Sequence, residues 1–378
     1  MQNTIIIDNS EEKKLKKYLD TRTDFEAQRI RRYYSMPDLS RTEGSPLKAM
    51  VDEVLKIPDF KNFDNIQIPE IVPADISFDL FNFAPDHVAR SKSDTYYVDD
   101  KNILRTHDTV MWYYYLNHPE IKKRIAAKEE LGVICYGKVY RKDEIDRHHM
   151  NIFHQMGGLY LVPDDKKILT LDDLKKILAD IAQTIFGKDV QYRFNVDTFP
   201  YTDPSLEMEV NINDKWIEVL GGGMPLKKVL ANFGVTGYNG WAFGFGLERL
   251  SIISMELPDI RLFWSTDERV KKQMQLGKKY VEVSKFPPIT RDISFIVDKD
   301  FQVNDYFDHI REIGGDLVEQ VELLDKYENP KKFGEGKVSY TYRVVYRSPE
   351  RTLKTEEVEP LQNQLYKETH ERYNAELR

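Results

Sequence analysis

Apolar residues recur at helical spacing in two long segments of the chain. Residues 45–57 read S-P-L-K-A-M-V-D-E-V-L-K-I, with apolar side chains every three or four positions. This period places those side chains on one side of a helix, and Ser45 followed by Pro46 is typical of a helix start. Residues 170–186 repeat the pattern behind a capping threonine. The pattern therefore predicts two amphipathic helices that each bury one face.

Alternation of apolar and polar residues dominates the middle of the chain. It runs through residues 132–140, 206–212 and 215–220, and an Asn-Asp pair separates the last two segments. Such a pair between alternating segments predicts a β-hairpin. Residues 241–255 lead from a glycine-punctuated strand into a helix. Strands in series with flanking helices predict an α+β fold, in which helices cover an antiparallel sheet.

A second domain is predicted to begin where the composition changes, at S-K-F-P-P, residues 284–288. Beyond this point strand and helix patterns follow the order β-α-β-β-α, with room for a final short strand. This order is typical of the ferredoxin-like α+β fold. We therefore expect an N-terminal arm at 1–44, a main α+β domain at 45–270, a linker at 271–283 and a ferredoxin-like domain at 284–378.

Composition places the chain among globular proteins. It has 378 residues, 41% hydrophobic and 31% charged, which suits two or three domains with substantial cores. No apolar run in the sequence approaches the roughly 20 residues that span a bilayer, so we expect no membrane partner. The single cysteine, Cys135, excludes an intrachain disulfide. The first residues are acidic and lack an apolar signal segment, so we expect a bacterial-type cytoplasmic location rather than mitochondrial import.

The distribution of charge bears on nucleic-acid binding. The formal net charge of −8 argues against non-specific coating of nucleic acid but permits a local basic patch. Arg29, Arg31 and Arg32 lie in a helical segment of the N-terminal arm. They fit either a solvated helix or an arm that contacts a phosphate backbone, and the composition of the segment favours the solvated helix.

Residues 140–158, Y-R-K-D-E-I-D-R-H-H-M-N-I-F-H-Q-M-G-G, form an unusual segment, which is densely charged and then turns apolar. Arg141 follows a predicted strand and precedes acidic residues on a loop. A planar guanidinium at a strand end can bind a phosphate through two hydrogen bonds and offset charge that develops during transfer. The alternative is that Arg141 only forms salt bridges on a surface loop. When Arg141 is considered alone, this alternative is the preferred interpretation.

Two further groups of residues suit nucleotide chemistry. G-F-G-L-E-R at 244–249 lacks the third glycine of a dinucleotide fingerprint, but Arg249 falls on a first helical turn, where it could clamp a nucleotide. Glu207, Glu209 and Glu218 lie on neighbouring strands. Carboxylates on a sheet floor are costly unless they bind a cation, and Mg²⁺ held together with phosphate oxygens would explain them. A solvent-facing sheet surface is the alternative.

The order of these features resembles motifs 1, 2 and 3 of class II aminoacyl-tRNA synthetases, and within that class the phenylalanyl-tRNA synthetases. The resemblance is carried by D-H-V-A-R-S-K-S-D-T-Y-Y, L-R-T-H, G-K-V-Y-R-K-D-E-I-D, F-H-Q-M, P-S-L-E-M-E, W-I-E-V-L-G-G-G-M, W-A-F-G-F-G-L-E-R-L and P-D-I-R-L-F-W. It covers nearly the whole chain from residue 20. The last part resembles the ferredoxin-fold anticodon-binding domain of the single-chain, mitochondrial-like enzymes.

The resemblance implies ATP-dependent activation of phenylalanine to its adenylate and transfer to the 3′ end of tRNA(Phe), with Mg²⁺, by a monomer or homodimer. Three charged residues are implied as catalytic: Arg141, Glu218 and Arg249. A loop trio would contact ATP together with them: His148, His149 and Met150. Two acids would face the metal ion: Glu207 and Glu218. The remaining residues would surround the amino acid, with the last two lining the phenyl pocket: Thr109, Asp108, Trp112, Gln155, Met156, Gly157, Ala242 and Phe243.

Several positions depart from the family pattern. Where the family usually reads R-T-H-x-S-A-H-Q, this chain reads R-T-H-D-T-V-M-W, so Met111 and Trp112 replace two polar residues. After F-H-Q the family usually has an apolar residue and then a glutamate that meets the α-amino group, whereas this chain has Met156 and Gly157. Burying an ammonium without a carboxylate is costly, and Asp108 could supply the missing charge. The alternative is that Asp108 faces away and a different amine site exists.

Residues 221–223 read G-G-G, where the family has a bulkier residue. The wall of the expected amino-acid pocket is therefore less tightly packed in this chain. Two alternatives to a phenylalanine–tRNA ligase therefore stay open. One is a synthetase paralogue that activates a different aromatic or non-proteinogenic amino acid. The other is a non-catalytic tRNA-binding relative that keeps the fold.

The C-terminal domain carries a predicted basic and aromatic stripe. Arg343, Arg347 and Arg351, together with Tyr342 and Tyr346, could bind phosphates and stack on unpaired bases of tRNA. The alternative is a paired strand whose Arg and Tyr side chains face water.

Overall fold

The computed structural model describes residues 3–144, 146–283, 286–348 and 350–378. The chain forms two compact units. The first comprises residues 1–141, 152–257 and 274–279, and the second comprises residues 142–151, 258–273 and 280–378. Among the described residues, every helix is too short or too polar to cross a membrane.

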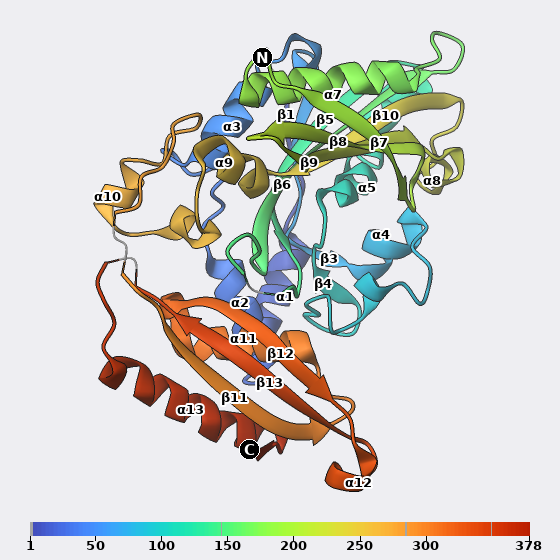
Figure 1. The fold of residues 1–378 in the computed structure, drawn as a ribbon. Helices are drawn as coiled ribbons and strands as arrows, with labels where there is room; N and C mark the ends of the chain where they lie inside the picture. Colours follow the sequence, from blue (N-terminus) through green and yellow to red (C-terminus); the bar gives the residue numbers. More distant parts are fainter. Residues whose placement is uncertain (1–2, 145, 284–285, 349) are drawn as a thin grey trace. The chain divides into compact units, whose positions relative to one another are not determined.

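The first unit is built on an eight-stranded sheet in the order β1-β2-β5-β6-β10-β9-β8-β7 (Figure 1). Its strands are β1 (Thr4–Ile6), β2 (Asp64–Gln67), β5 (Leu131–Tyr140), β6 (Ile152–Pro163), β7 (Tyr192–Phe199), β8 (Thr202–Ile212), β9 (Lys215–Pro225) and β10 (Tyr238–Gly246). The first three neighbours in this order pair in parallel, and the rest pair antiparallel. The antiparallel part confirms the predicted α+β architecture.

The predicted hairpin between β8 and β9 is confirmed. Asn213 and Asp214 turn the chain with φ values of 51° and 61°. Positive φ at both central residues is the geometry of the two-residue turns that match the twist of a hairpin, and Asn and Asp tolerate it better than most residues.

Three helices cover one face of this sheet: α3 (Pro46–Val54), α7 (Leu171–Phe186) and α9 (Leu247–Met255) (Figure 1). α3 begins as predicted, because Ser45 Oγ accepts a hydrogen bond from Leu47 N at 3.2 Å and Pro46 is the first helical residue. α7 begins with a capping box between Thr170 and Asp173. Both predicted helices are confirmed, and each buries the apolar side that the sequence period defines.

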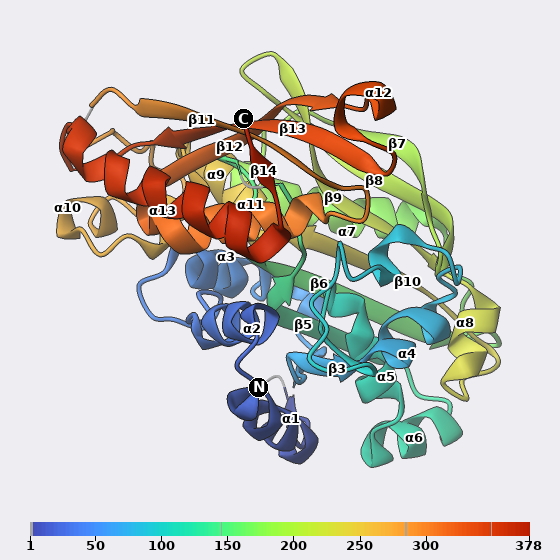
Figure 2. The same ribbon diagram turned by 90° about the horizontal axis from the view of Figure 1, so that it is seen from below.

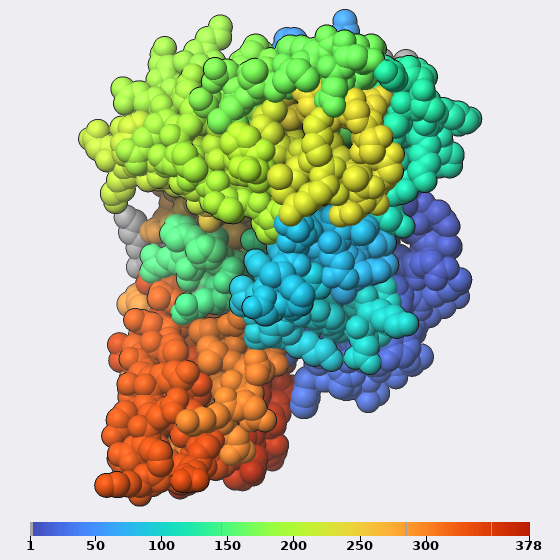
Figure 3. Space-filling view, turned by 90° about the vertical axis from the view of Figure 1, so that its right-hand side faces the viewer, coloured from blue at the N-terminus to red at the C-terminus, as the bar shows by residue number. Residues whose placement is uncertain are grey.

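Shorter elements cover the opposite face: α4 (Ala74–Phe78), α5 (Met111–Leu116), α6 (Pro119–Ala126), α8 (Lys227–Asn232), β3 (Ile71–Pro73) and β4 (Asn102–Leu104). Phe81 and Trp112 pack there in one hydrophobic core with Ala242 of the sheet. Figure 3 shows the blue-to-cyan segment that contains α4 against the yellow segment that contains α8. Asn232 Nδ2 joins the two segments by donating to Leu80 O at 2.8 Å.

The N-terminal arm contains α1 (Ser10–Thr21) and α2 (Phe25–Ser35). The predicted helix around Arg29 is confirmed as α2, but the expectation that it is fully solvated is wrong. Arg29 is 4% exposed, and Ile30 and Tyr33 of the same helix are also buried. Arg31 donates to Arg22 O at 2.8 Å. One side of α2 is therefore part of the core of the first unit.

The second unit contains a four-stranded sheet in the order β12-β13-β11-β14, on which α11 and α13 pack (Figure 2). Its elements are α10 (Glu268–Lys271), β11 (Ile289–Asp298), α11 (Val303–Gly314), β12 (Val318–Tyr327), α12 (Pro330–Phe333), β13 (Lys337–Tyr346), α13 (Thr355–Tyr373) and β14 (Glu376–Leu377). The order of the strands and long helices confirms the predicted ferredoxin-like fold.

The predicted stripe that combines arginines and tyrosines in this unit is wrong. Tyr342 and Tyr346 of β13 are 0% and 1% exposed and belong to the hydrophobic core. Arg343 and Arg347 alternate with them along the chain. Because successive side chains of a strand point to opposite faces, these arginines lie on the face of the sheet away from the tyrosines.

Candidate active site

Three glycines from adjacent strands form a bare area on the sheet of the first unit, which we call the glycine floor. Gly244 of β10 lies opposite Gly157 of β6 and opposite Gly221 of β9. A Cβ atom on Gly157 would overlap Asp108 Oδ2 and would lie 2.9 Å from Asp108 Cγ, and one on Gly221 would lie 3.1 Å from Phe199 Cζ. The absent side chains therefore leave room for Asp108 and Phe199 directly above the strands.

Asp108 lies over the glycine floor at the start of a 3-10 helix, Asp108–Val110. Its backbone N donates to Gln155 Oε1 at 3.1 Å, so β6 fixes its position. The side chain is 4% exposed, and Oδ2 has no hydrogen-bond partner among the described residues. Burial raises the pKa of the Asp108 carboxyl to about 7, even though the positive charges of Arg105 and Arg141 act in the opposite direction.

An aromatic wall stands beside Asp108. Phe199 and Tyr201 stack with ring centroids 6.0 Å apart, and Trp112 meets Tyr201 edge-on at 5.8 Å. Burial raises the pKa of Tyr201, and a side-chain hydrogen bond with Thr109 partly opposes that rise. Phe199, Tyr201 and Thr109 are only half-buried. A flat apolar group could therefore reach these rings while a polar group attached to it meets Asp108.

The buried His107 next to Asp108 is neutral. Burial, followed by the positive charge of Arg141, lowers its pKa to about 3. Its Nε2 lies 3.2 Å from Ser77 O. Because a carbonyl oxygen only accepts, Nε2 carries the hydrogen and donates it. His107 therefore adds no positive charge that could neutralise the neighbouring carboxylate.

Charged residues occupy the same face of the sheet further along the strands. Glu207 lies opposite Gly221, and paired residues of antiparallel strands point to the same face. A register shift after Met208 brings Glu209 opposite Glu218, which turns Glu218 to that face as well. Arg249 Nη1 lies 3.5 Å from Glu218 Oε1, and both side chains are about half exposed. The structure thus brings together the predicted Glu218 and Arg249.

Arg141 lies at the end of β5. Its Nε donates to Thr106 O at 3.0 Å, and its guanidinium carbon lies 5.2 Å from the ring centroid of Phe153. Phe153 is on β6, two and four residues before Gln155 and Gly157, so all three side-chain positions share a face. Arg141 is exposed and therefore accessible to an anionic ligand on the face that carries the glycine floor.

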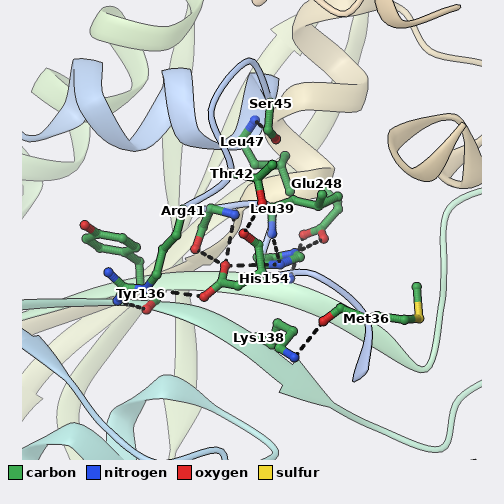
Figure 4. Close-up of polar contacts among 12 residues, drawn as sticks. Met36, Leu39, Arg41, Thr42, Ser45, Leu47, Tyr136, Lys138, His154 and Glu248 are labelled. Carbon is green, nitrogen blue, oxygen red and sulfur yellow. Dashed lines mark hydrogen bonds and ion pairs between the residues drawn. The ribbon is translucent and has the colours of Figure 1, made fainter. Parts of the chain in front are cut away.

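A buried histidine connects β6 to α9 and was not singled out from the sequence as a functional residue. His154 Nε2 accepts a hydrogen bond from Leu39 N at 2.9 Å, so its hydrogen is on Nδ1, which bonds Glu248 Oε1 at 2.6 Å (Figure 4). Glu248 Oε2 also accepts from His154 N at 2.8 Å. Since Glu248 precedes Arg249, this pair fixes the first turn of the helix that carries Arg249 to the strand that carries Gln155.

Two predicted substrate residues are not brought to this face. Met156 and Phe243 are one residue out of phase with Gly157 and Gly244, so their side chains point to the face covered by helices. A Cβ atom on Gly158 would meet the Phe243 ring at 2.5 Å. Phe243 therefore does not line the site that contains Asp108, whereas Ala242, in phase with Gly244, lies on the Asp108 face.

Phe199 and Tyr201 take the place that we predicted for Phe243. The signal for them was present in the sequence as F-P-Y at 199–201, directly before the acidic strand. Two aromatic residues two positions apart can share one face of an extended chain. The sequence does not assign this pair to a face, because Phe199 is the last residue of β7 and β8 begins only at Thr202, so no alternation pattern extends across the pair.

The loop trio lies in the second unit. His149 Nδ1 is 2.9 Å from Asp146 Oδ2, and Asp146 Oδ1 accepts from the backbone N of His148 and His149 at 2.6 and 2.7 Å. Met150 is 9% exposed. The two histidines are exposed at the surface of the loop. Within the second unit, Asp146 thus holds the backbone that presents them.

The acidic side chains of the site differ in whether they already accept hydrogen bonds from other side chains. Glu207 accepts from Asn195 Nδ2 at 3.2 Å, and Glu209 accepts from Arg193 Nε at 2.5 Å. No group of three His, Cys, Asp or Glu side chains suited to a metal ion occurs among the described residues. Glu218 is the acid best placed for a cation, because it is 53% exposed and lies on the glycine-floor face. Such a cation would need further oxygen ligands from a bound phosphate.

The three arginines predicted to bind tRNA are all engaged within the second unit. Arg343 makes two hydrogen bonds of 2.8 Å with Asp292. Arg347 donates to Glu319 at 2.9 Å and to Phe286 O at 2.9 Å. Arg351 is paired with Glu357, whose pKa is lowered to about 2, chiefly by that hydrogen bond. The side chain of Arg343 is 41% exposed and that of Arg347 is 33% exposed. Arg343 is therefore more accessible to an added anion than Arg347.

Comparison with known proteins assigns the class of this chain. Residues 33–274 match the family model described as "tRNA synthetases class II core domain (F)", and residues 284–378 match the ferredoxin-fold anticodon-binding domain. The chain belongs to the class II tRNA synthetase family.

The relatives narrow the assignment within that class. The chain is 39% identical over 331 residues to the chloroplastic/mitochondrial phenylalanine–tRNA ligase of Arabidopsis thaliana, covering 84% of this chain and 73% of that protein. It is 35% identical over 340 residues to the mitochondrial enzyme of Mus musculus, covering 80% and 72%. It is 33% identical over 392 residues to the probable mitochondrial enzyme of Drosophila melanogaster, covering 89% and 80%.

These relatives contradict the expectation of a bacterial-type cytoplasmic location. They are named as mitochondrial or chloroplastic enzymes. The expectation rested on the composition of the first residues, and the names of the relatives do not support it.

Proposed function

We propose that this chain is a phenylalanine–tRNA ligase, which activates phenylalanine with ATP and transfers it to the 3′ end of tRNA(Phe). One observation carries the proposal. A buried carboxylate, Asp108, and an aromatic wall, Phe199 and Tyr201, meet over a bare glycine floor. Charged residues suited to a nucleotide lie on the same face. The names of the relatives support the same reaction.

In the first step the carboxylate of the amino acid attacks the α-phosphorus of ATP, and pyrophosphate leaves. The phenyl ring lies against Phe199 and Tyr201, so the carboxylate points along the sheet toward Arg141. Arg141 binds the α-phosphate and offsets the charge that grows on it, which is the main contribution a protein makes to such a transfer. Arg249 binds the nucleotide, and Glu218 holds Arg249 in place at 3.5 Å.

A magnesium ion is expected in this chemistry. Among the acids on this face, Glu218 fits such an ion best, while Glu207 is partly engaged with Asn195. When bound, the ion would neutralise part of the negative charge of the phosphates and help to fix the position of ATP. The residues of the chain bind and orient the two substrates.

In the second step a hydroxyl of the 3′-terminal ribose of tRNA attacks the carbonyl carbon of the adenylate, so that an ester bond forms and AMP leaves. We assign activation to residues 45–270 and tRNA binding to residues 284–378, whose family match is an anticodon-binding domain. Among the basic residues of that domain, Arg343 is a candidate for contact with the phosphate backbone, because its partner Asp292 is also exposed and can be exchanged for an anion.

The test is ATP–pyrophosphate exchange with a panel of the twenty standard amino acids and several aromatic analogues. We expect exchange with phenylalanine above all others, and weak exchange with tyrosine, because an apolar site rejects an added hydroxyl by only about 100-fold. Exchange with phenylalanine at background level would refute the proposal. Strong exchange with another amino acid would instead identify a synthetase of different specificity, and no exchange at all would indicate a tRNA-binding protein without catalysis.

A further inference from the structure

Asp108 is a buried carboxylate that lacks a counter-ion within the protein. No ion pair within 4.0 Å involves it in the described part of the chain, and Oδ2 accepts no hydrogen bond. A buried polar group without a partner is costly and calls for an explanation. The aromatic wall beside it offers one hydroxyl, that of Tyr201, which is hydrogen-bonded with Thr109.

The charged and titratable groups that influence Asp108 do not satisfy it. They are Arg105, Arg141, Cys135 and Tyr201. Arg105 directs its Nε to Lys138 O at 2.6 Å and its Nη1 to Ile68 O at 3.4 Å. Arg141 directs its Nε to Thr106 O. The cations near Asp108 thus hold backbone carbonyls, and the carboxylate faces the glycine floor.

We propose that the Asp108 carboxylate, packed over Gly157, is the anchor for the α-ammonium group of the amino-acid substrate. The proposal rests on the proposed function and names the residue that recognises the amine. The Asp108 carboxyl accepts backbone hydrogen bonds from Asp108 and Thr109, and its Oδ2 still lacks a partner among the described residues. An ammonium is a compact donor of three hydrogen bonds, and a carboxylate oxygen that lacks a partner is its natural acceptor. With the ammonium at Asp108, the aromatic wall is beside the side chain of the substrate and Arg141 is beside its carboxylate.

Gly157 is the second half of this arrangement. Any side chain at position 157 would displace the Asp108 carboxylate, since even a Cβ atom would overlap its Oδ2. Gln155 acts as a positioning residue, because its Oε1 accepts from the Asp108 backbone N and fixes the turn that presents the carboxylate. Strand β6 thus provides both the space for Asp108 and the bond that orients it.

The test compares a ligand that has the amine with one that lacks it. Binding of L-phenylalanine and of 3-phenylpropanoate, its desamino analogue, would be measured by calorimetry on the full chain and on Asp108→Asn. We expect the variant to lose affinity for phenylalanine by about 100-fold, as for removal of one partner of a buried charge pair. Its affinity for 3-phenylpropanoate should stay the same or rise. An equal loss for both ligands, or no loss for phenylalanine, would overturn the proposal.

A pH profile gives a second readout that a merely structural role would not produce. In the wild type, the Kd for phenylalanine should increase as pH falls below about 7, where the Asp108 carboxyl takes up a proton. The increase should approach tenfold per pH unit. In Asp108→Asn the profile should be flat over the same range, and a profile unchanged by the substitution would contradict the assignment.

Failure of this inference can be told apart from failure of the proposed function. The exchange panel first identifies which amino acid the wild type activates. If that amino acid is not phenylalanine, the proposed function fails, and Asp108→Asn is then tested with the activated amino acid and its own desamino analogue. If the activated amino acid binds Asp108→Asn as tightly as the wild type, the inference fails whichever substrate the panel has identified.

Discussion

Replacing Asp108 by asparagine should stabilise the fold while it weakens the binding of phenylalanine. The carboxyl has a pKa of about 7 in the folded chain against an ordinary value of 3.8. At about 1.4 kcal/mol per pH unit, this difference corresponds to about 4 kcal/mol by which the ionised group disfavours the folded state at pH 7 and above. The amide of asparagine carries no charge, and burying it without a full set of partners costs about 1 kcal/mol. The expected net gain is about 3 kcal/mol.

The sign of the pH dependence follows from the raised pKa. Below pH 3.8 the carboxyl is protonated in both the folded and the unfolded chain, so the wild type carries no penalty. Between pH 3.8 and about 7 the unfolded chain releases the proton first, and the stability of the wild type falls relative to that of Asp108→Asn. The advantage of the variant should therefore grow from pH 5 to pH 7 and stay level above it.

Thermal unfolding without ligand at pH 5, 6, 7 and 8 measures this effect. For a unit of this size, about 3 kcal/mol corresponds to an increase in Tm of about 6–12 °C at pH 8. Asp64→Asn is a matched control, because Asp64 is also buried but accepts hydrogen bonds from Tyr115 at 2.6 Å and Arg124 at 2.7 Å. That control should lower Tm. A lower Tm for Asp108→Asn at pH 8, or the same change at pH 5 and pH 8, would refute the reasoning.

Three further predictions concern the site and the second unit. Gly157→Ala should weaken phenylalanine binding at least tenfold in calorimetry, because its Cβ would displace the Asp108 carboxylate; unchanged affinity would place the amine elsewhere. Arg249→Ala should lower the rate of pyrophosphate exchange by about 100-fold, the typical cost of losing one charge-stabilising donor, and a rate near that of the wild type would exclude Arg249 from nucleotide binding. Arg343→Gln should reduce the slope of log affinity for tRNA against log salt by about 1 and leave exchange unchanged; an unaltered slope would remove Arg343 from the tRNA contact.

The fold was largely predictable because its elements have strong local signals. The period of apolar residues and the cap at Ser45 define α3, and the Asn-Asp turn defines the β8–β9 hairpin. The alternation and helix spacing after residue 289 define the ferredoxin-like order. These features depend on neighbours in sequence, which a single sequence displays directly.

The site was only partly predictable, because the sequence does not say which face of a doubly buried strand meets the substrate. β10 reads W-A-F-G-F-G and is apolar on both faces, so its alternation does not separate Ala242 from Phe243. Asp108 could be predicted as a candidate because it stands in a short motif. Its partner Gly157 is 49 residues away, and only the three-dimensional structure shows that the two meet.

The glycine floor has a consequence for how the specificity of such an enzyme can change. Glycine has no side chain that a substitution could make smaller. A larger residue at position 157 would contact Asp108, and one at position 221 would contact Phe199. The sheet is therefore the invariant half of the site, and a substrate of another size has to be accommodated by the segments above it. Efforts to redirect this chain to unnatural amino acids should accordingly vary Phe199, Tyr201 and Trp112 and leave the three glycines of the floor unaltered.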